Sequence, residues 1–284
     1  MNRSVLNGKW GGRRQGGRGQ RGNSHLLSLR VGRPGEYIQL PRALIINNQQ
    51  PTTNNQQLRT KIFMATIYEV HPDTPQIRRI EKIRDDLRDG AVMLYPTDTV
   101  YAIGCDLNAK SAVERVRRLK QLSNDKPLTF LCSSLSNISQ YAWVSDPAYR
   151  IMRRLIPGPY TFLLPATKLV PRLVMNPKRK TSGIRVPDHR VCQALLESLG
   201  NPIISTSAHL DDDSGKTPFL GLERAKLFDQ FDSLVDIIVD NGSEPGSQVS
   251  TILDMTGDEP VIVRQGLGWE AATALAVPIS HSWE

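Results

Sequence analysis

An alternation of short apolar runs with helical segments constrains the fold of this chain more than any other feature. It begins near residue 64 and continues to about residue 268, with turn-forming residues between the segments. The apolar runs have the length of buried strands, and the helical segments carry apolar residues on one face. This pattern is typical of an α/β domain, in which helices cover a β-sheet. We therefore predict one domain over residues 64–284, with a sheet of about seven or eight strands.

Four helices are predicted, each from residues that favour a helix N-terminus. These N-terminal signals are Thr74-Pro75, a capping box of Ser111 and Glu114, Asp146-Pro147, and Asp188. The apolar face of the first helix is formed by Ile77, Ile80, Ile83 and Leu87. The strands are predicted at residues 91–95, 128–132, 161–164, 202–204, 236–239, 251–253 and 261–263.

The basic character of the chain is concentrated in its first 63 residues. The whole chain has a formal net charge of +8, from 36 lysines and arginines and 28 acids. Residues 1–63 contain eleven of the basic residues and a single acid, Glu36, so their net charge is +10. The rest of the chain therefore carries −2, and the high isoelectric point says nothing about the folded part.

Residues 1–63 show neither a helical nor a strand period, and they are rich in Arg, Gly, Asn and Gln. Such a composition cannot offset the entropy cost of ordering, so we predict a disordered leader. The composition changes abruptly at Met64, which favours Met64 as the true initiator and the leader as the product of a misplaced start. Two alternatives stay open, a transit peptide for an organelle and a disordered RNA-binding tail.

Several classes of protein are excluded by what the sequence lacks. Its three cysteines form no CxxC pair, which argues against a disulfide framework or a thiolate zinc site and favours a reducing compartment. No apolar run approaches the roughly 20 residues of a membrane helix, and no secretory signal follows the first basic residues. We predict a cytoplasmic protein with no membrane partner, or an organellar one if residues 1–63 are a genuine transit segment.

Polar residues gather where predicted strands end. Residues 95–104, YPTDTVYAIG, offer hydroxyls, a carboxylate and a phenol, and residues 203–209, IISTSAH, place three hydroxyls after a later strand. Because α/β sheets bind ligands beyond the carboxyl ends of their strands, both segments are candidate binding sites. The structural alternative for each segment is a proline-led or capped turn.

Cationic residues accompany these segments. Arg185 lies in a short apolar frame, GIRVP, where its planar donors would either bind two phosphate oxygens or form an ion pair within the sheet. The sequence alone favours neither the phosphate contact nor the ion pair for Arg185. Residues 117–120, RRLK, stand at a predicted helix C-terminus, where cations favour the helix dipole whatever the function.

No motif of covalent catalysis is present, neither GxSxG, HExxH, a Walker loop nor a GxGxxG after a strand. Ser207 and His209 lie two residues apart with no assignable acid, so we assign no catalytic nucleophile. Hydroxyls, cations and one carboxylate suit the binding of an anionic nucleotide beside a small polar molecule. Catalysis at such a site works by positioning and charge stabilisation.

Five segments resemble, in order, the motifs of the YrdC-like family. They are YPTDTVYAIG (95–104), PGPYTFLL (157–164), GIRVPDH (183–189), STSAHLDDDSG (205–215) and STILDMTGDEPVIVRQG (250–266). The resemblance covers about residues 70–268. It implies a single α/β domain with a twisted, open, mixed sheet, flanking helices and a concave basic cleft.

The best-known members of this family make threonylcarbamoyl-adenylate from L-threonine, bicarbonate and ATP, and they release pyrophosphate. The resemblance therefore implies a nucleotidyltransferase that serves the threonylcarbamoyladenosine modification of transfer RNA, with Mg²⁺ accompanying ATP and no prosthetic group. It places Thr99, Tyr101, Ser205 and Ser207 at the substrate. The residues that it places at the nucleotide are Lys120, Lys126, Arg185, Ser207, Ser250 and Arg264.

The chain departs from the synthases in their K-x-R, S-x-N tetrad. Leu122 stands in place of the arginine and His209 in place of the asparagine, and residues 69–78 and 170–187 look closer to the YciO branch. Loss of an arginine from a charged cleft typically costs several kcal/mol of transition-state stabilisation. A second function therefore stays open, a YciO-type protein that binds nucleotides or double-stranded RNA without efficient synthase activity.

Overall fold

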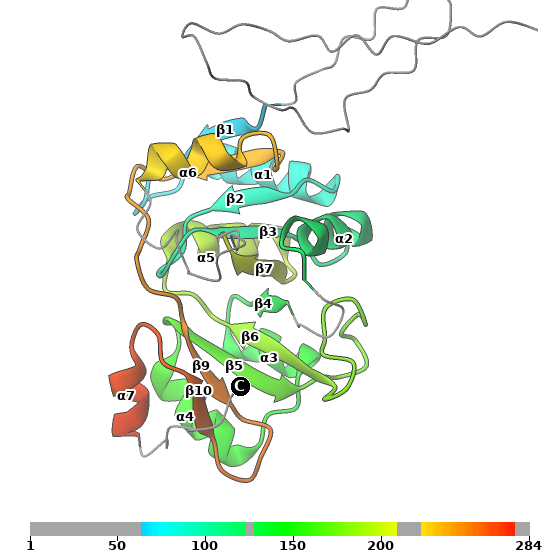
Figure 1. Ribbon diagram of the computed structural model, residues 1–284, viewed down its shortest axis with the longest axis vertical. Helices are drawn as coiled ribbons and strands as arrows, with labels where there is room; N and C mark the ends of the chain where they lie inside the picture. Colours follow the sequence, from blue (N-terminus) through cyan, green and yellow to red (C-terminus); the bar gives the residue numbers. More distant parts are fainter. Residues whose placement is uncertain (1–63, 123–127, 209–222, 276–284) are drawn as a thin grey trace, which may run out of the picture. The chain divides into compact units, whose positions relative to one another are not determined.

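The structure is a computed structural model that describes residues 64–122, 128–208 and 223–275. Its strands are β1 (Thr66–Glu69), β2 (Met93–Tyr95), β3 (Ala102–Asp106), β4 (Thr129–Leu131), β5 (Tyr160–Pro165), β6 (Thr181–Arg185), β7 (Ile203–Ser207), β8 (Ile237–Asp240), β9 (Thr251–Asp254) and β10 (Val261–Arg264). Within the described residues they form one sheet in the order β1-β8-β2-β3-β7-β4-β6-β5-β9-β10 (Figure 1). The pairs β1/β8, β8/β2, β4/β6 and β5/β9 are parallel and the others antiparallel. The predicted α/β class with an open, mixed sheet is confirmed.

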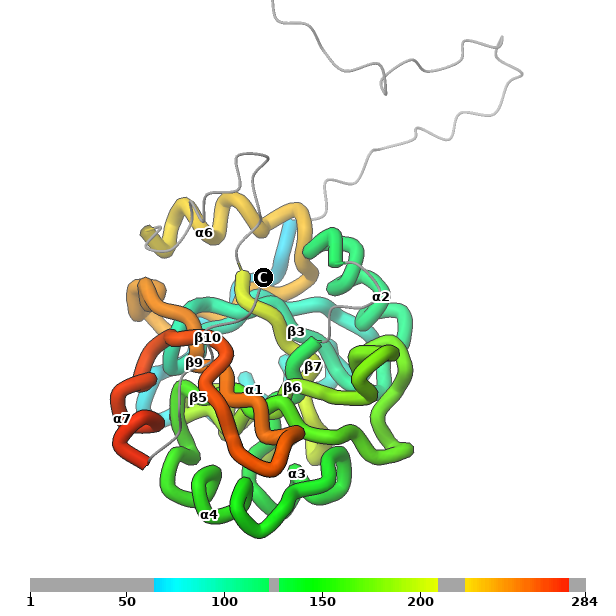
Figure 2. The backbone as a smooth tube through the Cα atoms, turned by 60° about the horizontal axis from the view of Figure 1, so that its bottom comes forward, coloured from blue at the N-terminus to red at the C-terminus, as the bar shows by residue number. Residues whose placement is uncertain are grey.

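Helices flank this sheet. They are α1 (Ile77–Arg88), α2 (Lys110–Leu119), α3 (Leu135–Tyr141), α4 (Asp146–Leu155), α5 (Arg190–Leu199), α6 (Arg224–Phe231) and α7 (Trp269–Ala274). Helices α1 and α5 bury their apolar faces in one core, and residues of the other five helices belong to a second core. Figure 2 shows α2 and α6 toward one end of the sheet and α3 and α4 toward the other.

The two cores lie on opposite faces of the sheet because side chains alternate along each strand. On β7, Ile203 belongs to the core under α1 and α5, and Ile204 belongs to the opposite core. Leu131 and Phe130 divide in the same way on β4. The core under α1 and α5 contains no described residue of β5, β6, β9 or β10. At that end of the sheet the same face is therefore available for a ligand.

The first predicted helix is confirmed as α1, with corrections to its start and to its buried face. It begins at Ile77 with Gln76 as the N-cap residue, and Thr74-Pro75 lie before it. Ile80, Ile83 and Leu87 are buried as predicted, but Ile77 is 75% exposed. The reason is that α1 begins at Ile77, and its packed face starts almost one turn later.

Two of the predicted helix caps are wrong. Ser111 lies inside the first turn of α2, whose N-cap is Ala109, so the capping box with Glu114 does not form. Asp188 is not the cap of α5 either, because the helix begins one residue later than predicted and His189 occupies the N-cap position. Neither helix has a side-chain hydrogen bond at its N-cap, so the local signals did not decide where they begin.

The sheet contains strands that the apolar runs do not predict, β1, β3 and β6, and the predicted number of seven or eight strands is too small. Helices α3, α6 and α7 are also not predicted. In β3 the run is interrupted by Gly104, which suggests a turn in the sequence. A Cβ atom at Gly104 would lie 2.8 Å from Cε1 of Tyr95 and 2.9 Å from Cγ2 of Ile203. The glycine therefore serves close packing inside a strand.

The prediction that residues 1–63 form a disordered leader lies outside the described residues, and so does the predicted boundary at its end. Among the helices that the structure describes, none is long and apolar enough to cross a membrane.

Candidate functional site

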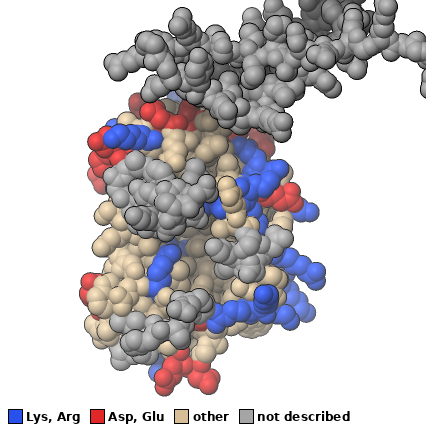
Figure 3. Space-filling model, viewed as in Figure 1, with Lys and Arg blue, Asp and Glu red and all other residues tan. Residues whose placement is uncertain are grey.

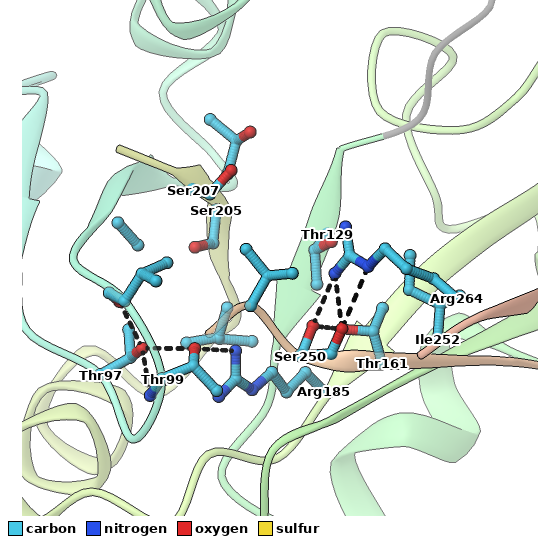
Figure 4. Close-up of a pocket in the computed structure, with 15 residues that line it drawn as sticks. Thr97, Thr99, Thr129, Thr161, Arg185, Ser205, Ser207, Ser250, Ile252 and Arg264 are labelled. Atoms are coloured by element: carbon cyan, nitrogen blue, oxygen red, sulfur yellow. Dashed lines mark hydrogen bonds between the residues drawn. The ribbon is translucent and has the colours of Figure 1, made fainter. Parts of the chain in front are cut away.

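A cleft opens on the sheet face that α1 and α5 leave uncovered. It contains about 760 Å³ of space, part of it continuous with solvent. Ten polar residues line it: Thr97, Thr99, Thr129, Thr161, Ser205, Thr206, Ser207, Ser250, Arg185 and Arg264. The other lining residues are Val100, Ala102, Leu131, Val249 and Ile252. Figure 4 shows most of the polar side chains around the common space between β7 and β9.

The register of the strands explains why these hydroxyls come together. Ser205 on β7 pairs with Thr129 on β4, and Thr161 on β5 pairs with Ile252 on β9. Residues that pair directly across two strands point to the same face of the sheet. Side chains from five or more strands therefore share one surface, although they are far apart in the sequence.

Arg185, at the end of β6, is held by the connection between β2 and β3. Its Nη1 donates to Oγ1 of Thr99 at 3.0 Å, and its Nη2 donates to Oδ1 of Asp98 at 2.5 Å. The two charged side chains are only 9% and 10% exposed, so they form a buried ion pair. Nε of Arg185 and Oδ2 of Asp98 have no hydrogen-bond partner among the described residues. Of the two roles predicted for Arg185, the ion pair within the protein is therefore present. Arg185 also lines the cleft.

Arg264 faces the cleft because of an irregularity in β10. Ile262 pairs with Leu253, and Arg264 pairs with Ile252, so Val263 is an extra residue between two consecutive pairs. In a regular strand Ile262 and Arg264 would point to the same face, since side chains alternate with a period of two. Ile262 is buried in the core opposite the cleft. The bulge therefore turns Arg264 to the other face.

The guanidinium of Arg264 is partly buried against Ser250 and close to a second positive charge. Its Nε and Nη2 donate to the Ser250 carbonyl oxygen at 3.1 and 2.7 Å, and Nη2 also donates to Ser250 Oγ at 3.1 Å. Burial lowers the pKa of Arg264 from its ordinary value, and the charge of Arg185 lowers it further. An anion bound between these arginines would offset both effects.

The connections that carry the remaining site residues approach each other closely. Thr97 and Thr99 lie between β2 and β3, and Val249 and Ser250 precede β9. A Cβ atom at Gly246 would lie 1.8 Å from the carbonyl oxygen of Thr99, so only glycine fits at this contact. The absence of a side chain at Gly246 thus brings the two connections together at one edge of the cleft.

The structure brings six of the predicted site residues together. Those lining the cleft are Thr99, Ser205, Ser207, Arg185, Ser250 and Arg264. Tyr101 and Lys120 are not among the lining residues. The Tyr101 hydroxyl donates to Oδ1 of Asn241 at 3.2 Å, and Lys120 is buried just after α2. Lys126 and His209 lie outside the described residues, and the ligand roles of all these residues stay predictions.

The sequence does not single out four hydroxyl residues that line the cleft. They are Thr97, Thr129, Thr161 and Thr206. Thr97 and Thr206 belong to segments that were singled out as a whole. Thr129 and Thr161 stand at the starts of apolar runs, where a threonine reads as an ordinary strand residue. Only the strand pairing shows that they face a cleft.

The described residues offer little for metal-centred or thiol chemistry. No group of three or more His, Cys, Asp or Glu side chains able to hold a metal occurs among them, and none of the lining residues is acidic. The cysteines that the structure describes are buried, and burial raises the pKa of Cys105 and Cys132 to about 12. The cleft is therefore equipped to bind oxygen atoms and negative charge.

Comparison with known proteins finds a matching family. The sequence profile of the family Sua5_yciO_yrdC, described as "Telomere recombination", matches residues 85–266. The "Uncharacterized protein YciO" of Escherichia coli is 41% identical over 205 residues, which cover 72% of this chain and 97% of that protein. A Vibrio vulnificus protein named threonylcarbamoyl-AMP synthase is 30% identical over 193 residues, 67% of this chain and all of that one.

Solved structures with a similar fold include YciO and Sua5 proteins. The crystal structure of E. coli YciO matches with a TM-score of 0.64 and 39% identity, over 72% of this chain and 97% of that chain. The crystal structure of P. abyssi Sua5 complexed with L-threonine matches with a TM-score of 0.65 and 25% identity, over 76% of this chain and 63% of that chain. The resemblance stated from the five motifs is confirmed, and this chain belongs to the Sua5/YciO/YrdC family.

Proposed function

We propose that the protein is a nucleotidyltransferase of the threonylcarbamoyl-AMP synthase type, which uses L-threonine, bicarbonate and ATP and serves the threonylcarbamoyladenosine modification of tRNA. The observation that carries this proposal is the cleft itself, which is lined by two arginines and eight hydroxyl-bearing residues and by no acidic residue. Such a surface favours an anionic ligand rich in oxygen atoms. Relatives named threonylcarbamoyl-AMP synthase and the threonine complex of P. abyssi Sua5 support threonine as one substrate.

The proposed reaction needs no protein nucleophile. The threonine amine and bicarbonate combine to a carbamate with loss of water. A carbamate oxygen then attacks the α-phosphorus of ATP in line, the bond between that phosphorus and the bridging oxygen to the β-phosphate breaks, and pyrophosphate leaves. Arg185 and Arg264 would stabilise the negative charge at the phosphates, and the hydroxyls would orient both substrates. Mg²⁺ would arrive as part of the ATP substrate, since the described residues offer no acidic cluster for a resident ion.

Pyrophosphate release and adenylate formation by the full chain test this proposal. Product should require MgATP, L-threonine and bicarbonate together, and omission of any one should abolish it. Arg264→Ala should lower kcat/KM about a hundredfold, because it removes a charged donor from the cleft. The matched control is Arg115→Ala, which removes an arginine paired at 2.6 Å with Asp236 away from the cleft and should change kcat/KM by less than about twofold.

Two observations favour the alternative of a YciO-type binding protein. Leu122, which stands in place of the synthase arginine, is half-buried and packs against the apolar core, and it is not among the cleft residues. Lysines and arginines also gather on the side of the described residues formed by α2 and the connection between β5 and β6 (Figure 3). The exposed basic residues there include Arg118, Lys168, Arg172, Lys178 and Lys180. Arg117 joins these two parts by donating to the Leu173 carbonyl oxygen at 2.9 Å.

The two functions predict different results. A binding protein would form no adenylate, and it would bind double-stranded RNA with an affinity that falls steeply with salt. Lys178→Glu with Lys180→Glu would then weaken RNA binding and flatten its salt dependence. A gain of adenylate formation from Leu122→Arg with His209→Asn would show that the two departures attenuate the family reaction.

A further inference from the structure

The phenol of Tyr95 reaches a cleft residue along the face of the sheet on which the cleft lies. Its hydroxyl donates to Oγ of Ser205 at 2.6 Å, and both groups are buried. Tyr95 lies on β2 and Ser205 on β7, with β3 between them. The ring crosses β3 at Gly104, which pairs directly with Ser205 and whose missing side chain leaves the necessary space. The first and last residues of the YPTDTVYAIG segment thus act on one serine.

The hydrogen bond from Tyr95 determines whether Ser205 donates or accepts a hydrogen bond when a ligand is bound. A serine hydroxyl has one hydrogen and accepts up to two hydrogen bonds. Ser205 accepts from Tyr95, and the described residues provide no acceptor for the Ser205 hydrogen, which lies on a residue that lines the cleft. A buried hydroxyl hydrogen without an internal acceptor must find one in the cleft. Ser205 is therefore left as a hydrogen-bond donor at this point.

The hydroxyls in the connection between β2 and β3 differ from Ser205, because their hydrogens are already used within the protein. Thr97 donates its single hydrogen to the Val100 carbonyl oxygen at 2.7 Å. The bond of 3.1 Å between Thr97 Oγ1 and Thr99 Oγ1 must then be donated by Thr99. Thr99 also accepts from Nη1 of Arg185. It therefore retains a lone pair for a ligand and no hydrogen.

We infer that Tyr95 is a positioning residue that fixes Ser205 as a donor, so that this part of the cleft selects an acceptor oxygen of a carboxylate, carbonate or phosphate, whereas Thr99 only accepts. The inference rests on the proposed function for the identity of that oxyanion. It goes beyond that function in two ways. It assigns Ser205 as a hydrogen-bond donor and Thr99 as an acceptor, and it gives a positioning role to Tyr95, which is fully buried.

Tyr95 is suited to this role because it keeps its hydrogen. Burial raises the pKa of Tyr95 far above its ordinary value, and the hydrogen bond to Ser205 and the charge of Arg185 offset only part of this effect. The phenol therefore remains a donor through the neutral and weakly alkaline pH range, and the polarity of Ser205 does not change there.

A double-mutant cycle on the full chain tests the inference. Calorimetry would measure the binding of MgATP, inorganic pyrophosphate, bicarbonate and L-threonine to the wild type, Ser205→Ala, Tyr95→Phe and the double variant. Ser205→Ala should weaken at least one of these oxyanions on the order of tenfold, and Tyr95→Phe should weaken the same one about threefold to fivefold. In the Ser205→Ala background, Tyr95→Phe should have no further effect, because it acts through the serine.

Tyr68→Phe is the matched control. It also removes a tyrosine hydroxyl from a side-chain hydrogen bond, to Oδ2 of Asp86 at 2.8 Å, but on the edge strand β1. It should lower stability without changing the affinity of any probe. If Tyr95→Phe does not fold, proton NMR of the wild type replaces the cycle. The Tyr95 hydroxyl resonance should move downfield when the oxyanion binds, because a ligand that accepts the Ser205 hydrogen strengthens the hydrogen bond from Tyr95 to Ser205.

Each other outcome overturns the inference. It fails if Ser205→Ala weakens no probe, if Tyr95→Phe weakens binding equally in both backgrounds, or if the resonance does not move on binding. Failure of the proposed function is a separate result. If Tyr95→Phe acts only when Ser205 is present but no adenylate forms from the three substrates, the inference stands and the proposed function fails. If adenylate forms but the effects of the two substitutions simply add, the proposed function stands and the inference fails.

Discussion

The buried ion pair of Asp98 and Arg185 links the cleft to the stability of the molecule. Asp98→Asn would leave a buried guanidinium without its charge partner, and we expect a loss of about 3 kcal/mol in the free energy of unfolding, measured with urea. Pyrophosphate should restore part of this loss, since Arg185 lines the cleft and would pair with the anion.

The surface pair of Arg84 and Asp85 provides the control for this prediction. The side chain of Asp85 is 60% exposed, so Asp85→Asn should change the free energy of unfolding by less than about 1 kcal/mol. Equal losses from both variants would show that the buried pair has no special part in stability.

His189 makes the stability of the molecule depend on pH. Burial lowers the pKa of His189 from its ordinary value, and Arg185 adds to this effect while Asp98 and Asp188 oppose it. The unfolded chain therefore binds this proton at a higher pH than the folded one. Stability is complete above the unfolded pKa of about 6.5 and falls as the pH drops below it, by at most about 1.4 kcal/mol per pH unit for one proton.

His189→Gln tests this dependence. Urea unfolding at about pH 7.5 and about pH 5.5 should show a smaller loss of stability in the variant than in the wild type. An identical loss in both proteins would assign the acid sensitivity to other groups.

At the scale of single elements, the bulge in β10 decides which face receives Arg264. Deletion of Val263, the extra residue, would remove the bulge and place Arg264 directly after Ile262, so that regular alternation would keep the arginine on the cleft face. We therefore expect the deletion to retain oxyanion affinity and to change kcat/KM by less than about threefold, whereas Arg264→Ala should lower kcat/KM about a hundredfold.

Deletion of Gly257 is the matched control for the bulge. This exposed residue lies in the connection between β9 and β10, where one residue can be lost without changing the strand register. It should lower stability with little change in kcat/KM. A hundredfold loss of kcat/KM after deletion of Val263, with little change after deletion of Gly257, would contradict the assignment of Val263 as the extra residue of the bulge.

At the scale of the whole molecule, residues 1–63 are predicted to add nothing to the stability of the α/β domain. Their composition cannot support a packed core, and the apolar periodicity starts only after them. The chain 64–284 should therefore unfold within about 2 °C of the full chain in calorimetry and bind the same oxyanions. A fall of more than about 5 °C in the thermal midpoint would show that the leader packs against the domain.

The sequence by itself determined the α/β class, the family, and six residues that line the cleft. These properties are local or carried by contiguous motifs, because apolar periodicity and strand-end segments such as residues 95–104 and 183–189 can be read along the chain. The sequence also indicated an ion pair or a phosphate fork at Arg185, but it contained no information on the partner. Asp98 is 87 residues away in the chain.

Only the tertiary structure decided how these residues combine. Strand order and register place Ser205, Thr129 and Thr161 on one face, and no local pattern specifies which strands become neighbours. The bulge that turns Arg264 and the contact of Tyr95 with Ser205 depend on pairings between distant segments, the latter 110 residues apart. The physical reason is that alternation along a strand assigns a side chain to one of two faces, while the choice of face and of neighbours is made by packing of the whole sheet.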